Sequence, residues 1–306
     1  MGTASVLLTA EAKMARRGRP PSNNGLLRVL SQNRLNMAGA LLTLVLIVGA
    51  GVGPLVLPDP FATAPPDRFQ APSLVHWFGT DNLGRDQLAR ITLGLRLSIV
   101  VALGAVALGM AVGVLLGLVA GYYGGAVDNF IMRVLDVFFA FPGLLLALAM
   151  IAALGSSIVN LVLTMGVLFA PSMARVTRGP VLSIRQKEFV EAARALGVRE
   201  PVIVRTHILP NVVAPIIVAS TLQLSAAILI EASLGFLGLG IGPPNPSLGG
   251  LISASRTFMG QGPWMAIFPG LAITMLVTGF NLVGDGLRDA VDPRLRDVLD
   301  SRTAIR

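Results

Sequence analysis

The sequence has no cysteine and few charged residues. The absence of cysteine from its 306 residues excludes disulfide bonds and thiolate metal sites. Charged side chains make up 13% of the chain, well below the quarter or so that soluble domains usually carry. A soluble globular fold is therefore not expected, and the 54% of hydrophobic residues must be explained in another way.

Motifs of nucleotide-binding and catalytic chains are also missing. No stretch has the GxxxxGK[ST] pattern of a phosphate-binding loop, so nucleotide binding must come from a partner. The two histidines, His76 and His207, are predicted on opposite sides of a membrane and cannot share a metal ion. No triad or two-histidine pattern indicates an intramembrane enzyme. The sequence therefore predicts no catalytic residue and no metal ligand.

Six apolar stretches are long enough to cross a bilayer as helices. A hydrocarbon core about 30 Å thick needs roughly 20 apolar residues in a helix, because lipid offers no partner for an unpaired backbone amide. The sequence predicts spanning helices at residues 37–57, 97–120, 134–154, 158–174, 212–239 and 266–287. The predicted fold class is an all-α polytopic membrane protein with six transmembrane helices.

Basic residues are distributed unevenly between the predicted loops. The formal net charge is +8, but Lys and Arg do not gather on one face as they do in nucleic-acid-binding proteins. With the N-terminus inside, nineteen of the 24 basic residues lie on the cytoplasmic side and five lie outside. This positive-inside bias predicts two cytoplasmic termini. Residues 37–57 are predicted to be a retained anchor, since they are longer than the roughly 7–15 apolar residues of a signal peptide.

This topology divides the chain into five parts. A cytoplasmic tail is expected at residues 1–36, followed by the first transmembrane helix at 37–57 and an outer loop at 58–94. Residues 95–287 form a core with five transmembrane helices, and residues 288–306 form a second cytoplasmic tail. At the end of the outer loop, helical spacing predicts an interfacial helix that leads into the core, from Leu88, Ile91 and Leu95.

Glycines recur at regular spacing in the second predicted helix. Gly109, Gly113, Gly117 and Gly121 are four residues apart and therefore share one face. Small residues let another helix approach closely, because van der Waals contact drives helix association in lipid. We expect a helix–helix contact along this face; the alternative is that glycine is simply common in membrane helices.

The cytoplasmic loop at residues 175–210 is long and patterned. Ser183 followed by Gln186 fits a capping box and predicts the start of a helix. An apolar stripe then runs along that helix beside a charged face, formed by Phe189, Ala192, Ala193 and Leu196. Such a stripe is too small to span a membrane and fits the groove of a partner protein. The alternative is an amphipathic helix on lipid headgroups.

Glycine and proline divide this loop into a helical hairpin. Gly197 is predicted to end the first helix, because glycine takes the left-handed conformation at little cost. Pro201 fits the first turn of a second short helix, and Pro210 is predicted to end it. The loop is therefore expected to form two short helices joined at a glycine.

The same loop resembles the EAA loop of ABC importer permeases. It has the residues of that motif in order, namely Glu191, Ala192, Ala193, Gly197, Leu209 and Pro210. In that family the loop forms coupling helices that sit in a cleft of the ATP-binding subunit, and the resemblance implies the same role for these six residues. The family often has an aliphatic residue where this chain has His207, and Ile208 is expected to take over the apolar role.

Five further stretches resemble the C-type subunits of dipeptide, oligopeptide and nickel permeases. They are FGTDNLGRD at 78–86, AGYYGGAVD at 120–128, MRVLDVFFAFPGLLLAL at 132–148, EASLGFLGLGIGPPNPSLG at 231–249 and GFNLVGDGLRDAVDPRL at 279–295. Together they cover most of the chain outside the tail and the first helix. The resemblance implies the type I ABC importer permease fold.

The resemblance also implies an assembly in the bacterial cytoplasmic membrane. Members of this permease family work with a B-type homologous permease subunit, two ABC ATPase subunits and an extracytoplasmic substrate-binding protein. ATP and Mg²⁺ are then bound by the ATPase subunits, and this chain holds no cofactor. Di- and oligopeptides are the expected cargo, with nickel chelates and glutathione-like molecules as alternatives. A secondary transporter would need inverted repeats and central charges, and neither is found.

Polar groups inside predicted transmembrane helices are candidates for the translocation path, because a charge in lipid costs several kcal/mol. The candidates are Glu231, Asn281, Asp136 and Asp285. Asp136 and Asp285 lie near inner helix ends, where pairing with Arg133 and with Arg288, or contact with headgroup water, is the favoured interpretation. Glu231 is predicted to line the outer mouth of the path or to hold a gate through backbone amides, and a structural role at a helix end is weighed equally.

Overall fold

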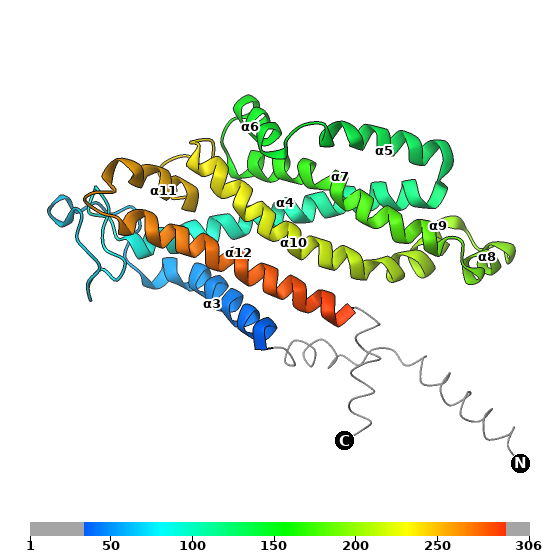
Figure 1. Cartoon of the computed structure of the whole chain (residues 1–306), viewed down its shortest axis with the longest axis horizontal. Helices are drawn as coiled ribbons and strands as arrows, with labels where there is room; N and C mark the ends of the chain where they lie inside the picture. The colour runs from blue at the N-terminus through cyan, green and yellow to red at the C-terminus, as the bar shows by residue number, and fades with distance from the viewer. Residues whose placement is uncertain (1–33, 292–306) are drawn as a thin grey trace, which may run out of the picture.

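The computed structural model describes residues 34–291, which form a bundle of long helices (Figure 1). Within these residues, five helices are long and apolar enough to cross a membrane: α3 (Arg34–Val56), α4 (Gln87–Tyr123), α7 (Ile158–Ile184), α10 (Leu209–Phe236) and α12 (Trp264–Val291). A bent pair, α5 (Gly125–Phe139) and α6 (Gly143–Leu154), makes the sixth crossing when the two are taken as one span. The all-α class predicted from the sequence is confirmed.

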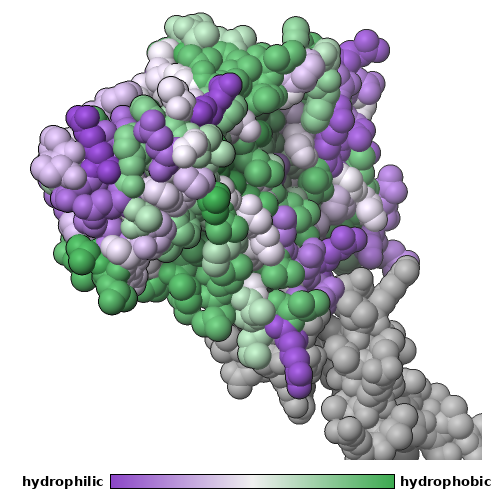
Figure 2. All heavy atoms as spheres, turned by 60° about the vertical axis from the view of Figure 1, so that its left-hand side comes forward, coloured by the Kyte–Doolittle hydropathy of each residue, from purple (hydrophilic) through white to green (hydrophobic). Residues whose placement is uncertain are grey.

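Short elements lie at the two ends of the bundle. One end carries α8 (Glu188–Ala195), α9 (Glu200–Ile203) and the π-helical turn η2 (Val204–Ile208). The other carries α11 (Leu248–Ser255), the single turns η1 (Pro65–Asp67) and η3 (Arg256–Phe258), and the loop before α4 (Figure 1). Figure 2 shows hydrophobic residues over the middle of the molecule and hydrophilic residues towards both sides of the view, as a membrane span requires.

The tails expected at residues 1–36 and 288–306 lie outside the described residues, except where they join α3 and α12. The first of the spanning helices begins at Arg34 and ends at Val56, close to its predicted bounds. Other predictions differ more from the structure, at residues 88–95, 134–154, 175–196 and 210.

The third predicted helix, at residues 134–154, is wrong as a single helix. α5 and α6 meet at an angle of 85°. Pro142 stands directly before α6 with an extended ψ of 123°. Proline has no N–H and disfavours the helical conformation of the residue before it, so it favours a break at this point, although α7 continues through two prolines of its own.

Two helices extend past their predicted ends. The interfacial helix predicted near Leu88 is not separate, because its residues are the first turns of the 37-residue α4, capped by Asp86. α7 continues to Ile184 instead of ending at residue 174, so Ser183 lies inside it and caps nothing. α8 begins later, at Glu188, without a side-chain cap. Val181, near the end of α7, is fully buried, and this packing outweighs the local capping signal.

Pro210 does not end the second short helix, contrary to the prediction. α9, η2 and α10 follow one another without a break. In η2 the N–H of Leu209 donates to the carbonyl of Val204, five residues earlier. This wide turn makes room for the proline ring, which would clash with a carbonyl in a regular α-helix. The Asn211 side chain also donates to the His207 carbonyl at 2.7 Å.

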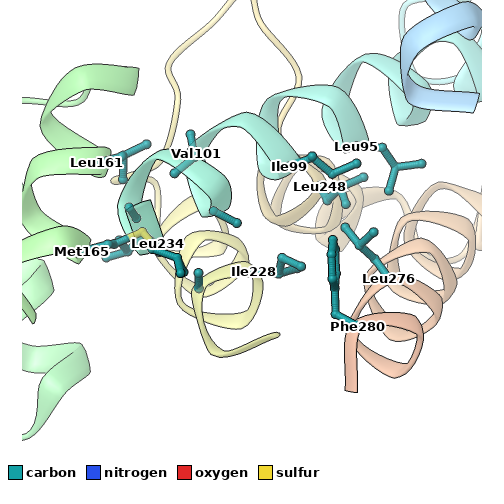
Figure 3. Close-up of a cluster of buried hydrophobic side chains, with 14 of the residues drawn as sticks. Leu95, Ile99, Val101, Leu161, Met165, Ile228, Leu234, Leu248, Leu276 and Phe280 are labelled. Atoms are coloured by element: carbon teal, nitrogen blue, oxygen red, sulfur yellow. The ribbon is translucent and has the colours of Figure 1, made fainter. Parts of the chain in front are cut away.

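The core lies where four of the long helices cross. Figure 3 shows the contributing side chains: Ile99 and Val101 from α4, Leu161 and Met165 from α7, Ile228 and Leu234 from α10, and Leu276 and Phe280 from α12. All are at most 8% exposed. Since lipid is as apolar as these side chains, the close packing itself stabilises the bundle.

The glycine face of α4 contacts α7, as predicted. A Cβ atom added at Gly113 would stand 2.5 Å from the Ala170 carbonyl oxygen. A Cβ at Gly117 would stand 2.5 Å from the Ala174 carbonyl oxygen. α4 and α7 share the most extensive helix contact among the described residues, so these glycines set how closely the two helices approach.

Reporter fusions test the expected orientation of the bundle. The loop that holds Arg68 and the hairpin that holds Arg199 lie at opposite ends of the bundle (Figure 1). We expect alkaline phosphatase fused after Arg68 to be active and the same fusion after Arg199 to be inactive, because the enzyme matures only outside the cytoplasm. Green fluorescent protein at the same two sites is the matched control and should give the reverse pattern. Equal reports from both sites would contradict the topology.

Candidate functional site

The hairpin of α8 and α9 projects from one end of the bundle (Figure 1). Gly197 ends α8 as predicted, with φ of +78°. The Gly197 N–H donates to the Arg194 carbonyl at 3.0 Å, and the Val198 N–H donates to the Ala193 carbonyl at 3.1 Å. These two bonds form a Schellman motif, which places a left-handed residue at the position of the glycine. The direction of α9 is therefore set at Gly197.

The predicted apolar stripe of α8 is divided between two faces. Ala193 is buried together with Val190, which the stripe did not include. Phe189 and Leu196 point away from the bundle and are 45% and 83% exposed. On α9, Val202 is 47% exposed. We call these three exposed side chains, with the exposed Ala192, the docking face.

The remaining residues of the predicted loop motif lie around this face. Glu191 is exposed in the first turn of α8, and Leu209 and Pro210 lie at the start of α10. Ile208 is fully buried, consistent with the apolar role expected for it. The centres of the His207 and Phe189 rings lie 6.2 Å apart. His207, the residue that departs from the family pattern, therefore contacts the hairpin directly.

Tyr122, at the end of α4, connects the hairpin to the bundle. The Arg194 Nη2 atom donates to the Tyr122 hydroxyl at 3.2 Å, and the Arg185 Nη1 atom donates to the Tyr122 carbonyl at 2.9 Å. Arg194 also pairs with Glu200 of α9 at 3.3 Å. Tyr122 is only 6% exposed. Sequence reasoning missed this residue, and its place in the stretch 120–128 was the one available signal.

Two aspartates of α5 pair with arginines of α7. Asp136 forms an ion pair with Arg175, at 2.5 Å. The sequence had suggested Arg133 as its partner. The observed pair therefore joins α5 to α7, two helices that contact each other. Asp128 binds both Nε and Nη2 of Arg178, at 2.5 and 2.6 Å, a bidentate pair that sequence reasoning missed. The Arg175 guanidinium also lies 3.8 Å from the centre of the Phe139 ring.

Glu231, on α10, contacts α4 and has no exposed surface. The Ser98 hydroxyl donates to its Oε2 atom at 2.6 Å. Its Oε1 atom has no hydrogen-bond partner within residues 34–291. In this conformation Glu231 therefore contacts a side-chain hydroxyl of the neighbouring helix. On α12, Asn281 is half-buried and Asp285 is exposed; the four candidate path residues do not come together at one site.

Comparison with known proteins places this geometry in context. The model of the family described as binding-protein-dependent transport system inner membrane component matches residues 113–297. The dipeptide transport system permease protein DppC of Alkalihalophilus pseudofirmus is 45% identical over 268 residues, 87% of this chain and 88% of that protein. The glutathione transport system permease protein GsiD of Pectobacterium atrosepticum is 45% identical over 227 residues, 74% of this chain and 75% of that protein.

A solved structure supports the fold. A chain of the MetNI methionine ABC transporter, in an inward-facing conformation, is similar with a TM-score of 0.52. The likeness covers 67% of this chain and 96% of that chain at 22% identity, which bears on the fold alone.

Proposed function

The chain belongs to the family of binding-protein-dependent transport system inner membrane components, and on this premise we propose that it forms half of the translocation path of an ATP-driven importer for di- and oligopeptides. The names of the dipeptide and glutathione relatives support a peptide cargo, since glutathione is itself a small peptide. The other half is a B-type homologous permease subunit. An extracytoplasmic binding protein delivers the peptide, and two separate ATPase subunits bind ATP and Mg²⁺.

The exposed docking face is the observation that carries the coupling role. Phe189 and Leu196 expose large apolar surfaces on an eight-residue helix, and such surfaces mark a contact with another molecule. The hairpin lies at one end of the long axis of the bundle (Figure 1), whereas hydrophobic residues cover the middle of the molecule (Figure 2). This position favours a cleft in an ATPase subunit over lipid headgroups as the partner.

The connection to Tyr122 gives the hairpin a route into the membrane. When the ATPase subunits close on ATP, they displace the docked hairpin. Arg194 and Arg185 hold Tyr122, so the displacement passes to the inner end of α4. ATP binding favours one state of the path only if the contacts at the hairpin differ between the two states. This chain therefore transmits the conformational change and does not hydrolyse ATP.

The orientation and the path follow from the same proposal. The hairpin and both termini are cytoplasmic, and the loop before α4 is extracytoplasmic, in a bacterial inner membrane. Asp136 and Arg175 are about half exposed, at 57% and 47% of their side chains. Because an exposed ion pair is costly against lipid, this pair faces the partner permease or the path. Asn281 and Asp285 are further candidates along it, whereas Glu231 is enclosed between helices in this conformation.

Charge reversal at Glu191 tests the proposal in the reconstituted importer. We expect Glu191→Lys to leave membrane insertion intact but to reduce uptake of a radiolabelled dipeptide about tenfold or more, because a charged contact at a desolvated interface is replaced by a repulsive one. Co-purified ATPase subunits and peptide-stimulated ATP hydrolysis are measured on the same preparation. Glu191→Gln is the matched control, which removes the charge without reversing it and should have a smaller effect.

Two outcomes would count against this function. Wild-type chain that purifies without any ATPase subunit would remove the importer proposal. Glu191→Lys protein with unchanged subunit stoichiometry, ATP hydrolysis and uptake would remove the docking role of α8.

A further inference from the structure

A cavity of about 430 Å³ opens at the end of the bundle opposite the hairpin. Arg85, in the loop just before α4, and Arg90, in the first turn of α4, form one wall. The glycine- and proline-rich loop after α10 and the first residues of α11 form the other wall, with Gly242 and Ser247 among them. We call this space the outer cavity. Two of the stretches that carry the family resemblance, 78–86 and 231–249, meet at it.

The two arginines share a single carboxylate. Nε of Arg85 lies 2.7 Å from Oδ2 of Asp81, and Nε of Arg90 lies 3.6 Å from the same oxygen. Asp86, the next acidic residue, is engaged elsewhere, because its oxygens accept from the Ala89 N–H and contact the His76 ring. One guanidinium charge is therefore left without a full partner.

Arg90 is buried with part of its hydrogen-bonding capacity unused. It is only 6% exposed, and its Nη1 atom donates to the Pro60 carbonyl at 3.1 Å. Its Nε atom is buried 3.6 Å from Oδ2 of Asp81, too far for a hydrogen bond, and has no hydrogen-bond partner within the described part of the chain. A buried donor without a partner costs free energy, and a guanidinium on a cavity wall gains most from an anion.

The opposite wall leaves room for a ligand and supplies no negative charge. Of the described residues that line the cavity, none is acidic. Nothing lies within 4 Å of a Cβ added at Gly242. The Ser247 hydroxyl is already used, since it accepts from the Gly250 N–H at 3.1 Å and caps α11.

We propose that the outer cavity binds a carboxylate group presented from outside the membrane. The guanidinium fork matches the two oxygens of a carboxylate, and the low exposure of Arg90 strengthens such a bond. Two sources carry this chemistry: the C-terminal carboxylate of a cargo peptide, and an acidic side chain of the delivering binding protein. The two sources are inferred from the proposed importer function. The carboxylate site itself is inferred from the residues that line the cavity.

Two pairs of variants test the site in the intact importer, reconstituted in nanodiscs. Arg85→Gln removes a charge from the cavity wall, and Arg96→Gln, at an exposed position of α4, removes one away from the cavity as the control. Gly242→Asp adds a carboxylate that competes for the arginines, and Gly242→Asn adds an uncharged side chain of equal size. Gly242 has space for either side chain, so the second pair stays informative where loss of Arg85 disturbs the loop.

Binding of two probes is measured on each variant. The first probe is dialanine, compared with its C-terminal amide, on the importer without binding protein. The second is docking of the purified binding protein. We expect Arg85→Gln and Gly242→Asp each to lower the affinity for one probe by about tenfold or more, because one charge-assisted bond is lost. The two control variants should bind both probes with affinities near wild type. Loss of dialanine binding alone assigns the carboxylate to the cargo, and loss of docking alone assigns it to the binding protein.

The site is excluded if both cavity variants bind both probes like their controls, or if the wild-type importer binds neither probe. In both cases the proposed importer function is retained if the wild-type complex takes up dipeptide. If the wild-type complex takes up no dipeptide, the importer function is contradicted. The docking of the binding protein to the cavity variants and their controls then still tests whether the cavity binds a carboxylate.

Discussion

Leucine at Gly113 or Gly117 is expected to prevent stable packing of α4 against α7. A Cβ atom at either position would lie 2.5 Å from a backbone carbonyl oxygen, a distance that real Cβ contacts do not reach. A carbonyl inside a helix cannot rotate away as a side chain can, so the two helices must separate. We expect a loss of roughly 3 kcal/mol or more, at the upper end of the usual cost of overpacking.

Detergent-solubilised protein provides the measurement. Gly113→Leu and Gly117→Leu should lower the yield of monodisperse complex in fluorescence-detected size-exclusion chromatography and lower its melting temperature. Gly49→Leu in α3 is the matched control, because nothing lies within 4 Å of a Cβ added there. Normal assembly and melting temperature in both variants would show that the close approach of α4 and α7 does not depend on these glycines.

Valine at Gly197 is expected to uncouple ATP hydrolysis from peptide uptake. Gly197 has φ of +78°, and a β-branched residue there is strained by roughly 1–2 kcal/mol. Relief of this strain breaks the Schellman bonds and turns α9 away from its present direction. The docking face then loses its shape, although the membrane helices are untouched. Uptake should fall much more than basal ATP hydrolysis.

Asparagine at the same position separates backbone strain from side-chain volume. No atom lies within 4 Å of a Cβ added at Gly197, so both side chains have space. Asparagine tolerates the left-handed conformation far better than valine does. We expect Gly197→Asn to keep most of the uptake and Gly197→Val to lose it. Equal activity of the two variants, in a reconstituted complex with normal subunit stoichiometry, would refute the role assigned to the left-handed turn.

Local features were readable from the sequence because they depend on neighbouring residues. Apolar runs of sufficient length predicted the spanning helices, since lipid leaves the backbone no other way to satisfy its polar groups. The four-residue spacing of Gly113 and Gly117 predicted one packing face, and α7 does contact it. Gly197 ended α8 as expected, because the left-handed conformation is a property of one residue.

Other features depended on which helices become neighbours. Asp136 pairs with Arg175, and Tyr122 receives Arg194, across helices that are distant in sequence. The wide turn before Pro210 exists because the segment is held in one continuous helix, which a local rule for proline does not consider. Ser183 is a second example, because the packing of α7 against α4 extends the helix past the position where this residue was predicted to cap a new one.

The outer cavity shows the same division. Residues 78–86 and 231–249 each resemble C-type permease subunits, but the resemblance does not show that the two stretches touch. Only the packed bundle brings Arg85 and Arg90 beside the loop after α10. The sequence by itself therefore determined most of the spans, the glycine face and the left-handed turn at Gly197. The tertiary structure decided the ion pairs and the cavity, because an unpaired charge finds its partner through packing and not through sequence distance.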